Sequence, residues 1–185
     1  MQPFASEAMK RVMIVGGPGS GKSTLARALG PLTGLPVFHM DHIHHLPGWV
    51  ERPKSEKDRL TREVHSREAW IFEGGHSRTY AERLARADTL IWLDLPVSLR
   101  LWRVIRRTLR YRGRSRPDLP DGCPERVNIE MLRFLAYIWR TRRQARAKIQ
   151  AMAEGPPPHV RVVHLTNGKA VNSFLRALRT SPQQG

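Results

Sequence analysis

The residues whose types and spacing could carry out chemistry begin at Gly16, in the segment GGPGSGKST. The segment fits a known phosphate-binding pattern, in which a glycine and four variable residues precede Gly-Lys-Ser. Glycines let backbone N–H groups approach a phosphate, the lysine ammonium reaches the outer phosphates, and the serine hydroxyl ligates Mg²⁺. We therefore predict a nucleoside triphosphate site, with Lys22 also catalytic, formed by Gly16, Gly17, Pro18, Gly19, Ser20, Gly21, Lys22, Ser23 and Thr24.

Acidic residues end three of the apolar runs that follow this segment. Asp41 ends LPVFHMD, Glu73 ends AWIFE, and Asp94 ends TLIWLD. Strands of a parallel sheet present their carboxyl ends at one edge, where ligands bind. A carboxylate there could take the proton of an acceptor hydroxyl or hold Mg²⁺ through water. We predict the first role for Asp41 and the second for Glu73 together with Ser23, whereas Asp94 fits a turn equally well.

Four histidines surround Asp41, namely His39, His42, His44 and His45. Histidine-rich segments can bind transition metals. No cysteine lies nearby, however, and a Mg²⁺–nucleotide site prefers oxygen ligands. A structural metal site and a direct contact with phosphate or acceptor both stay open.

The chain is strongly basic, with 32 lysines and arginines against 16 aspartates and glutamates and a formal net charge of +16. Many arginines lie on or beside residues 111–125, YRGRSRPDLPDGCPE, whose glycines and prolines predict an exposed loop between two helices. Arginines on such a lid could close over a transferring phosphoryl group and stabilise its charge. A solvated basic face is the other interpretation. We predict catalytic roles for Arg107, Arg110, Arg140 and Arg143, and nucleotide contact for Arg114.

The elements that must position these residues alternate between strands and helices, which predicts a parallel α/β sheet. We expect strands at residues 11–15, 35–40, 69–75, 88–96 and 160–165. We expect helices at residues 21–29, 55–67 with Ser55 as N-cap, 79–87, 97–112, 125–153 and 169–178.

The length of 185 residues fits one domain. We place it at residues 10–180, after a flexible extension at 1–9 and before a disordered tail at 181–185. Cys123 is the single cysteine, which excludes an internal disulfide and fits a reducing cytoplasm. No stretch approaches the roughly 18 uncharged apolar residues of a membrane span. We therefore expect a cytoplasmic protein without a membrane partner.

These motifs resemble the P-loop kinases related to adenylate kinase, and within them the bacterial proteins labelled "topology modulation protein". The resemblance runs from Lys10 to about Leu178 and includes GGPGSGKSTLARAL, AWIFEGGHSRT, RLARADTLIWLDLP, LWRVIRRTLRYRGRSRPDLPDGCPER and FLAYIWRTRR. It implies an α/β fold of the P-loop NTPase type, with a five-stranded parallel sheet in the order 2-3-1-4-5. Helices would flank the sheet, and an arginine-rich lid at about 111–125 would cover the nucleotide.

The resemblance also implies an acceptor site. Asp41 would lie near substrate or Mg²⁺, and Arg83 would contact acceptor phosphate, with Arg78 a weaker candidate. The family usually has Asp followed by Gly-Asn-Tyr where this chain has Glu73 followed by Gly-Gly-His, so the carboxylate is one carbon longer. The predicted substrate residues are Asp41, Gly74, Arg78 and Arg83.

Together these observations predict a phosphotransferase that uses ATP and Mg²⁺ and moves the γ-phosphoryl group to a small acceptor, a nucleotide or nucleoside. A second interpretation is a nucleic-acid-associated ATPase affecting DNA topology, whose basic surface and exposed aromatics Trp102, Tyr111 and Trp139 bind nucleic acid without sequence specificity. A third is a nucleotide-binding protein without catalysis.

Overall fold

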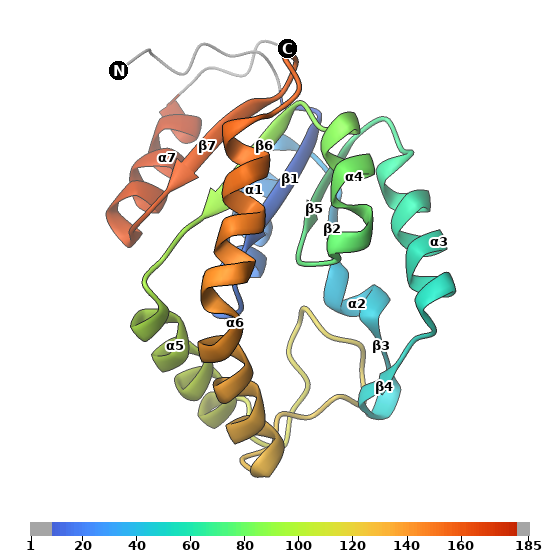
Figure 1. Ribbon diagram of the computed structural model, residues 1–185, viewed down its shortest axis with the longest axis vertical. Coiled ribbons are helices and arrows are strands. Elements are labelled where there is room, and N and C mark those ends of the chain that lie inside the picture. Colours follow the sequence, from blue (N-terminus) through green and yellow to red (C-terminus); the bar gives the residue numbers. More distant parts are fainter. Residues whose placement is uncertain (1–8, 181–185) are drawn as a thin grey trace.

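The computed structural model describes residues 9–180. Except for Met9, the predicted N-terminal extension lies outside the described residues, as does the predicted tail at 181–185. The fold is a five-stranded parallel sheet with helices on both faces (Figure 1). Its strands, in chain order, are β1 (Arg11–Gly16), β2 (Val37–His39), β5 (Trp70–Glu73), β6 (Thr89–Leu93) and β7 (Arg161–Leu165). Their spatial order is β2-β5-β1-β6-β7, which confirms the predicted order 2-3-1-4-5.

The apolar runs become central strands because the helices bury both faces of the sheet. Alternate residues of β1 enter two separate cores. Val12 and Ile14 pack in one core with α1 (Lys22–Thr33) and α7 (Gly168–Thr180). Met13 and Val15 pack in the other with α3 (Lys54–His65), α4 (Tyr80–Arg86) and the C-terminal part of α6 (Ile129–Glu154).

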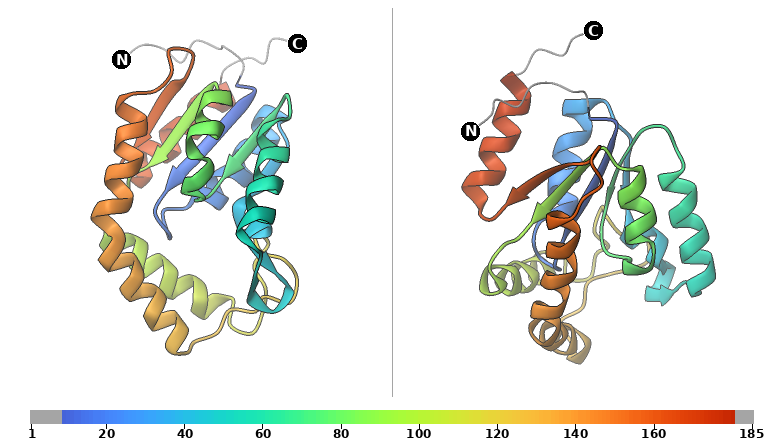
Figure 2. Two further views of the ribbon diagram at one scale, coloured as in Figure 1. Left: turned by 45° about the vertical axis from the view of Figure 1, so that its right-hand side comes forward. Right: turned by 45° about the horizontal axis from the view of Figure 1, so that its top comes forward.

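The remaining elements lie beyond the carboxyl ends of the strands, on the side where the site forms (Figures 1 and 2). They are α2 (Met40–His44), η1 (Pro47–Trp49), η2 (Ser77–Thr79), α5 (Val97–Arg110) and the short strands β3 (His45–Leu46) and β4 (Val50–Glu51). Residues 111–128, here called the connecting segment, join α5 to α6. This segment contacts the β3–β4 hairpin, where Trp49 Nε1 donates to Pro124 O at 2.9 Å.

Of the six predicted helices, only α5 begins at the predicted residue; α6 begins four residues later, and the other four begin one residue away. The helix expected from residue 125 begins at Ile129, because Asn128 caps it by accepting a hydrogen bond from Met131 N at 3.2 Å. Helix α3 begins at Lys54 directly after Pro53, so Ser55 lies inside the helix and is not its N-cap.

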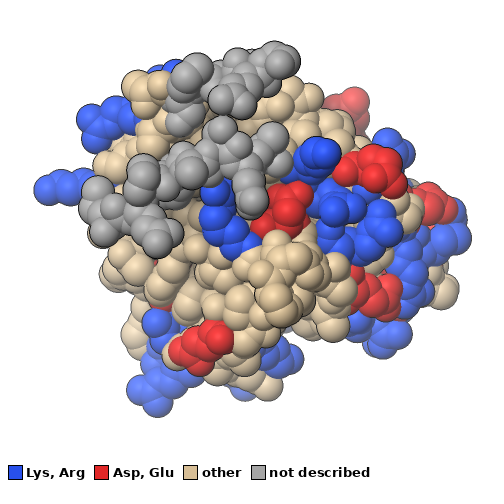
Figure 3. Space-filling model, turned by 90° about the horizontal axis from the view of Figure 1, so that it is seen from above, with Lys and Arg blue, Asp and Glu red and all other residues tan. Residues whose placement is uncertain are grey.

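On the face seen from above in Figure 3, basic and acidic side chains are mixed on the side of α3 and α4. The ion pairs Arg59–Glu63 and Arg62–Glu82 lie on these two helices. No helix within residues 9–180 is long and apolar enough to cross a membrane.

Candidate active site

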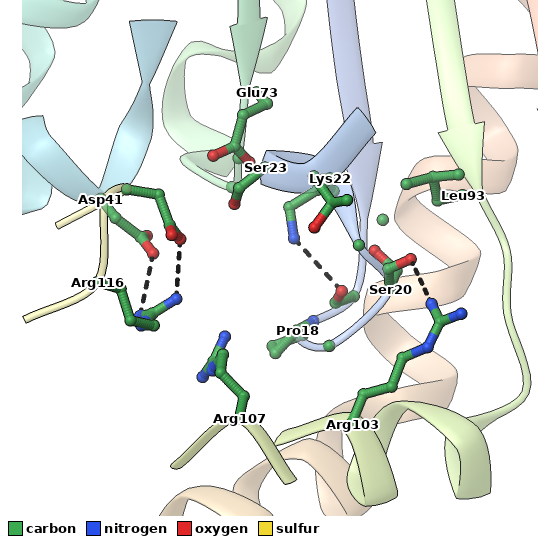
Figure 4. Close-up of a pocket in the computed structure, with 18 of the residues that line it drawn as sticks. Pro18, Ser20, Lys22, Ser23, Asp41, Glu73, Leu93, Arg103, Arg107 and Arg116 are labelled. Atoms are coloured by element: carbon green, nitrogen blue, oxygen red, sulfur yellow. Dashed lines mark hydrogen bonds and ion pairs between the residues drawn. The ribbon is translucent and has the colours of Figure 1, made fainter. Parts of the chain in front are cut away.

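A cavity of about 1560 Å³ opens at the carboxyl edge of the sheet. The glycine-rich loop, α2, the end of β5, α5, the connecting segment and α6 all contribute to its wall. Figure 4 shows the side chains that meet in it: Lys22 and Ser23 from the start of α1, Glu73 from β5, Asp41 from α2, and Arg107 and Arg116 from the opposite wall. Segments far apart in the sequence therefore form one site.

The glycine-rich loop folds tightly against α5, and this fixes its shape. Gly19 has a φ of 76°, and a Cβ atom there would lie 2.3 Å from the carbonyl oxygen of Arg100, so only glycine fits. Lys22 Nζ donates to Gly17 O at 3.3 Å, and Arg103 Nη1 donates to Ser20 O at 3.2 Å. The free N–H groups at the start of α1 and its positive dipole end face the same space, which makes the loop an anion cradle.

Glu73 lies at the end of β5 and is 2% exposed. Its Oε1 is hydrogen-bonded to His39 Nδ1 at 2.8 Å, and the Ser23 side chain lies beside it (Figure 4). Burial raises the pKa of Glu73, but the hydrogen bond with His39, the charge of Lys22 and the neighbouring Ser23 hydroxyl outweigh burial and hold the pKa below its ordinary value. Glu73 is thus a carboxylate next to the Ser23 hydroxyl.

Asp41 faces the connecting segment across the cavity. Its carboxylate lies 3.8 Å from Arg116 Nη2, and its side chain is 45% exposed (Figure 4). An exposed carboxylate beside an arginine can hydrogen-bond a ligand hydroxyl while the arginine contacts an anionic group.

Arg116 is held by two buried carboxylates of its own segment. Its Nη1 lies 2.8 Å from Asp118 Oδ2, and its Nε lies 2.7 Å from Glu125 Oε1. Asp118 also pairs with Arg27 of α1 at 3.3 Å. The Arg27–Asp118 ion pair anchors the connecting segment to α1.

Sequence reasoning did not select Arg103, Arg116, Asp118 or Glu125. The sequence did carry a signal for the last three: acidic residues within an arginine-rich loop. A buried carboxylate requires a cationic partner, so such residues indicate specific ion pairs.

Not all of the predicted residues line this cavity. Those that do are the loop residues 16–24, Asp41, Glu73, Gly74, Arg107 and Arg110. Arg114 and Arg140 are exposed and outside its wall, and Arg143 lines a second cavity. Arg78 pairs with Asp58 at 3.1 Å.

Arg83 is 0% exposed, donates to Gly74 O at 3.0 Å and stacks on Phe72 with its guanidinium 4.1 Å from the ring centroid. Burial lowers the pKa of Arg83 to about 10. Its contacts hold the turn at Gly74 from behind.

The four histidines around Asp41 have different surroundings. His39 is bonded to Glu73, whereas His44 and His45 line the cavity with Trp49. Burial is the main cause that lowers the pKa of both His44 and His45, so their imidazoles are neutral at pH 7. Within residues 9–180, no three His, Cys, Asp or Glu side chains converge as a metal site.

Comparison with known proteins gives both sequence relatives and structural neighbours. Shikimate kinase from Acinetobacter baumannii (strain AYE) is 30% identical over 155 residues, covering 76% of this chain and 83% of that protein. Shikimate kinase from Rhodococcus jostii (strain RHA1) is 28% identical over 145 residues, covering 70% of this chain and 82% of that protein. No model of a protein family matches the chain.

Two solved structures share the fold at low identity. Shikimate kinase from Acinetobacter baumannii in complex with shikimate has a TM-score of 0.54 at 20% identity, covering 94% of this chain and 92% of that one. A gluconokinase from Sinorhizobium meliloti 1021 has a TM-score of 0.51 at 16% identity, and the match covers 94% of this chain and 91% of that one.

The fold, the site and these relatives define an ATP-dependent P-loop kinase that acts on a small molecule, as predicted. The chain belongs to the shikimate kinase family, on the strength of its 30% identity over most of both chains. The finer resemblance to the topology modulation proteins stays a prediction.

Proposed function

We propose that this kinase transfers the γ-phosphoryl group of ATP to a hydroxyl of a small hydroxy acid, with shikimate and sugar acids as the first candidates. The predicted acceptor was a nucleotide or nucleoside, but the relatives are named for shikimate and a gluconokinase is among the structural neighbours. The observation that carries the proposal is the placement of Asp41 and Arg116 in one cavity with Lys22.

On the nucleotide side, the glycine-rich loop supplies N–H groups for the phosphates. The cavity continues between α5 and α7, where Leu99, Trp102 and Arg103 lie across from Val171 and Asn172. This mixture of an aromatic, an arginine and an amide suits a nucleoside.

The residues around Ser23 fit Mg²⁺. The Ser23 hydroxyl lowers the pKa values of both the Glu73 and the Asp118 carboxylates, so this place gathers the oxygen donors that Mg²⁺ prefers beside phosphates. We propose that Ser23 holds the ion, with Glu73 acting through water as predicted and Asp118 as an additional carboxylate. Bound there, the ion would neutralise charge that develops on the β- and γ-phosphates.

On the acceptor side, Asp41 accepts a hydrogen bond from the acceptor hydroxyl and takes its proton as the phosphoryl group transfers. His44 and His45 are neutral and can hydrogen-bond further hydroxyls, while Trp49 closes the wall. Lys22, Arg107 and Arg116 surround the transferring group and stabilise its charge. Positioning and electrostatics account for the rate, and no covalent intermediate is involved.

The nucleic-acid interpretation is not favoured. Acidic and basic side chains are interleaved on the face in Figure 3, and Arg116 and Arg107 in the site pair with Glu125. A nucleic-acid surface instead requires clustered, unpaired cations.

The test is an acceptor panel in the presence of ATP and Mg²⁺, scored by release of ADP above the rate without acceptor. It contains shikimate, gluconate, other sugar acids, nucleosides and nucleoside monophosphates. A hydroxy acid should give the highest kcat/KM, and Asp41→Asn should lower its kcat by about 10²–10⁴-fold. Asp121→Asn is the matched control, because Asp121 is exposed and outside the cavity wall. Preference for a nucleoside or nucleotide would overturn the proposed acceptor class.

A further inference from the structure

A second cavity, of about 450 Å³, lies behind the glycine-rich loop between α5 and α6. Its wall includes Gly17, the segment 92–97, and Arg100, Arg142, Arg143 and Arg146. Of the roles proposed above for nucleotide, Mg²⁺ and acceptor, none uses these arginines. A volume of this size is within the range of small-molecule sites.

Arg100 is the most informative residue of this wall. Arg100 is only 8% exposed, and its Nε has no hydrogen-bond partner within residues 9–180. A Cβ atom placed on Gly17 would lie 1.4 Å from Arg100 Nη1, so the guanidinium lies directly against the loop. A buried N–H group of a guanidinium that lacks such a partner is costly, since it has lost water without replacing it.

The acidic charge around Arg100 does not balance the positive charge of the arginines. Asp94 is the acidic residue of the cavity wall, against four arginines. Asp94 already accepts bonds from Arg146 Nη2 at 2.8 Å and Nε at 3.0 Å, and from His164 Nε2 at 3.2 Å. Burial lowers the pKa of Arg100, and Asp94 opposes this only by its charge. The cavity therefore keeps an excess of positive charge.

The first turn of α5 adds hydrogen-bond donors to the same wall. Val97 opens the helix after Pro96, no side chain caps this end, and no acidic residue lies in its first turn. Both Pro96 and Val97 line the cavity. The free N–H groups and the positive dipole end of α5 therefore add to the positive potential that the arginines create in this cavity.

We propose that this second cavity binds a phosphate group, either as inorganic phosphate or as part of a small phosphate ester, independently of the nucleotide in the loop. Guanidinium groups match phosphate oxygens through paired N–H donors, which favours phosphate over a monovalent anion. Arg100 binds it at the base and Arg143, which is exposed, binds it at the mouth. The ligand would lie on the other side of Gly17 from ATP.

The experiment measures phosphate binding by calorimetry with the glycine-rich loop already filled by AMP-PNP and Mg²⁺, so that phosphate cannot bind there. Inorganic phosphate, glycerol 3-phosphate and glucose 6-phosphate are titrated separately. Saturation of the loop is verified first by titrating AMP-PNP alone. The variants are Arg100→Met and Arg143→Gln, and the latter alters only an exposed side chain and so keeps the test valid if Arg100→Met unfolds. Arg133→Gln is the charge-matched control, because it removes one exposed arginine from the same helix outside this cavity.

We expect one phosphate equivalent to bind, with affinity lowered at least about tenfold by Arg143→Gln and by Arg100→Met and unchanged by Arg133→Gln. Tighter binding of an ester would identify the source as a phosphorylated metabolite, whereas equal or weaker binding would identify inorganic phosphate. Absence of binding to the nucleotide-filled enzyme would overturn the proposal, as would binding that Arg143→Gln leaves unchanged. Neither result bears on which acceptor the kinase phosphorylates.

Discussion

Arg116 Nε and Glu125 Oε1, both within the connecting segment, lie 2.7 Å apart, and both residues are 7% exposed. This ion pair closes the segment on itself. It also presents the remaining N–H groups of Arg116 to Asp118 and to the cavity. Fixed charges of this kind stabilise a transferring phosphoryl group without reorganising during the reaction.

Arg116→Lys should lower kcat at least about 100-fold while the protein stays folded. Lysine keeps the positive charge, but it cannot contact Glu125, Asp118 and a phosphoryl oxygen at the same time. The measurement is steady-state kinetics with the best acceptor of the panel, alongside thermal unfolding. Arg112→Lys, an exposed position in the same segment, should keep wild-type kcat. Equal kcat in both variants would remove Arg116 from the mechanism.

Gly19→Ala should destabilise the protein by at least about 2 kcal/mol and abolish ATP binding, since it forces a left-handed residue and a clash with α5. The clash is with Arg100 O, 2.3 Å from the added Cβ. Gly34→Ala is the control: its φ of 69° is also left-handed, but no atom lies within 4 Å of the added Cβ. It should cost about 1–2 kcal/mol and leave ATP affinity unchanged. Chemical denaturation and calorimetry with ATP would show whether the two variants differ.

How far the sequence determines this site can be judged from particular residues. The strands were predictable because short apolar runs alternate with helical segments, which indicates a parallel sheet, whereas the strand order followed only from the family resemblance. The nucleotide-binding loop was predictable because its chemistry requires a fixed local spacing. Arg116 and Arg83 were not predictable, since their environments depend on contacts distant in the sequence. Arg116 is held by Glu125, and Arg83 is enclosed by Phe72, Tyr80 and the turn at Gly74.

Arg83→Met should leave the affinity for the acceptor within about threefold of wild type. The side chain is 0% exposed and contacts Gly74 O, so methionine removes one hydrogen bond to the turn, worth about 1 kcal/mol. Acceptor kinetics and thermal unfolding of the variant test this. If the acceptor instead binds at least about 100-fold more weakly, Arg83 would return to the acceptor contact implied by the family resemblance, since losing a charged hydrogen bond to a ligand has an effect of that order.

The free energy of unfolding should fall as the pH drops from 7.5 to 5.5. Burial is the main cause that lowers the pKa of His65, and the pKa values of His44 and His45 are lowered in the same way. The unfolded chain titrates near pH 6.5 and takes up protons first, so stability present above pH 6.5 is lost as the pH falls toward the folded pKa values, by up to about 1.4 kcal/mol per pH unit and histidine.

His65→Gln should make this pH dependence shallower, whereas His159→Gln, at an exposed position, should leave it unchanged. Urea unfolding at pH 7.5, 6.5 and 5.5 gives the slopes. Identical slopes in wild type and His65→Gln would rule out His65 as a source of the acid sensitivity.

The most direct test of phosphoryl transfer to a small hydroxy acid is to follow the γ-phosphate of ³²P-labelled ATP. The account predicts that the label moves to shikimate or a sugar acid in equal amount with the ADP formed, and that Asp41→Asn and Lys22→Ala both suppress the labelled product. Label recovered only as inorganic phosphate, at a rate independent of every hydroxy acid, would contradict it.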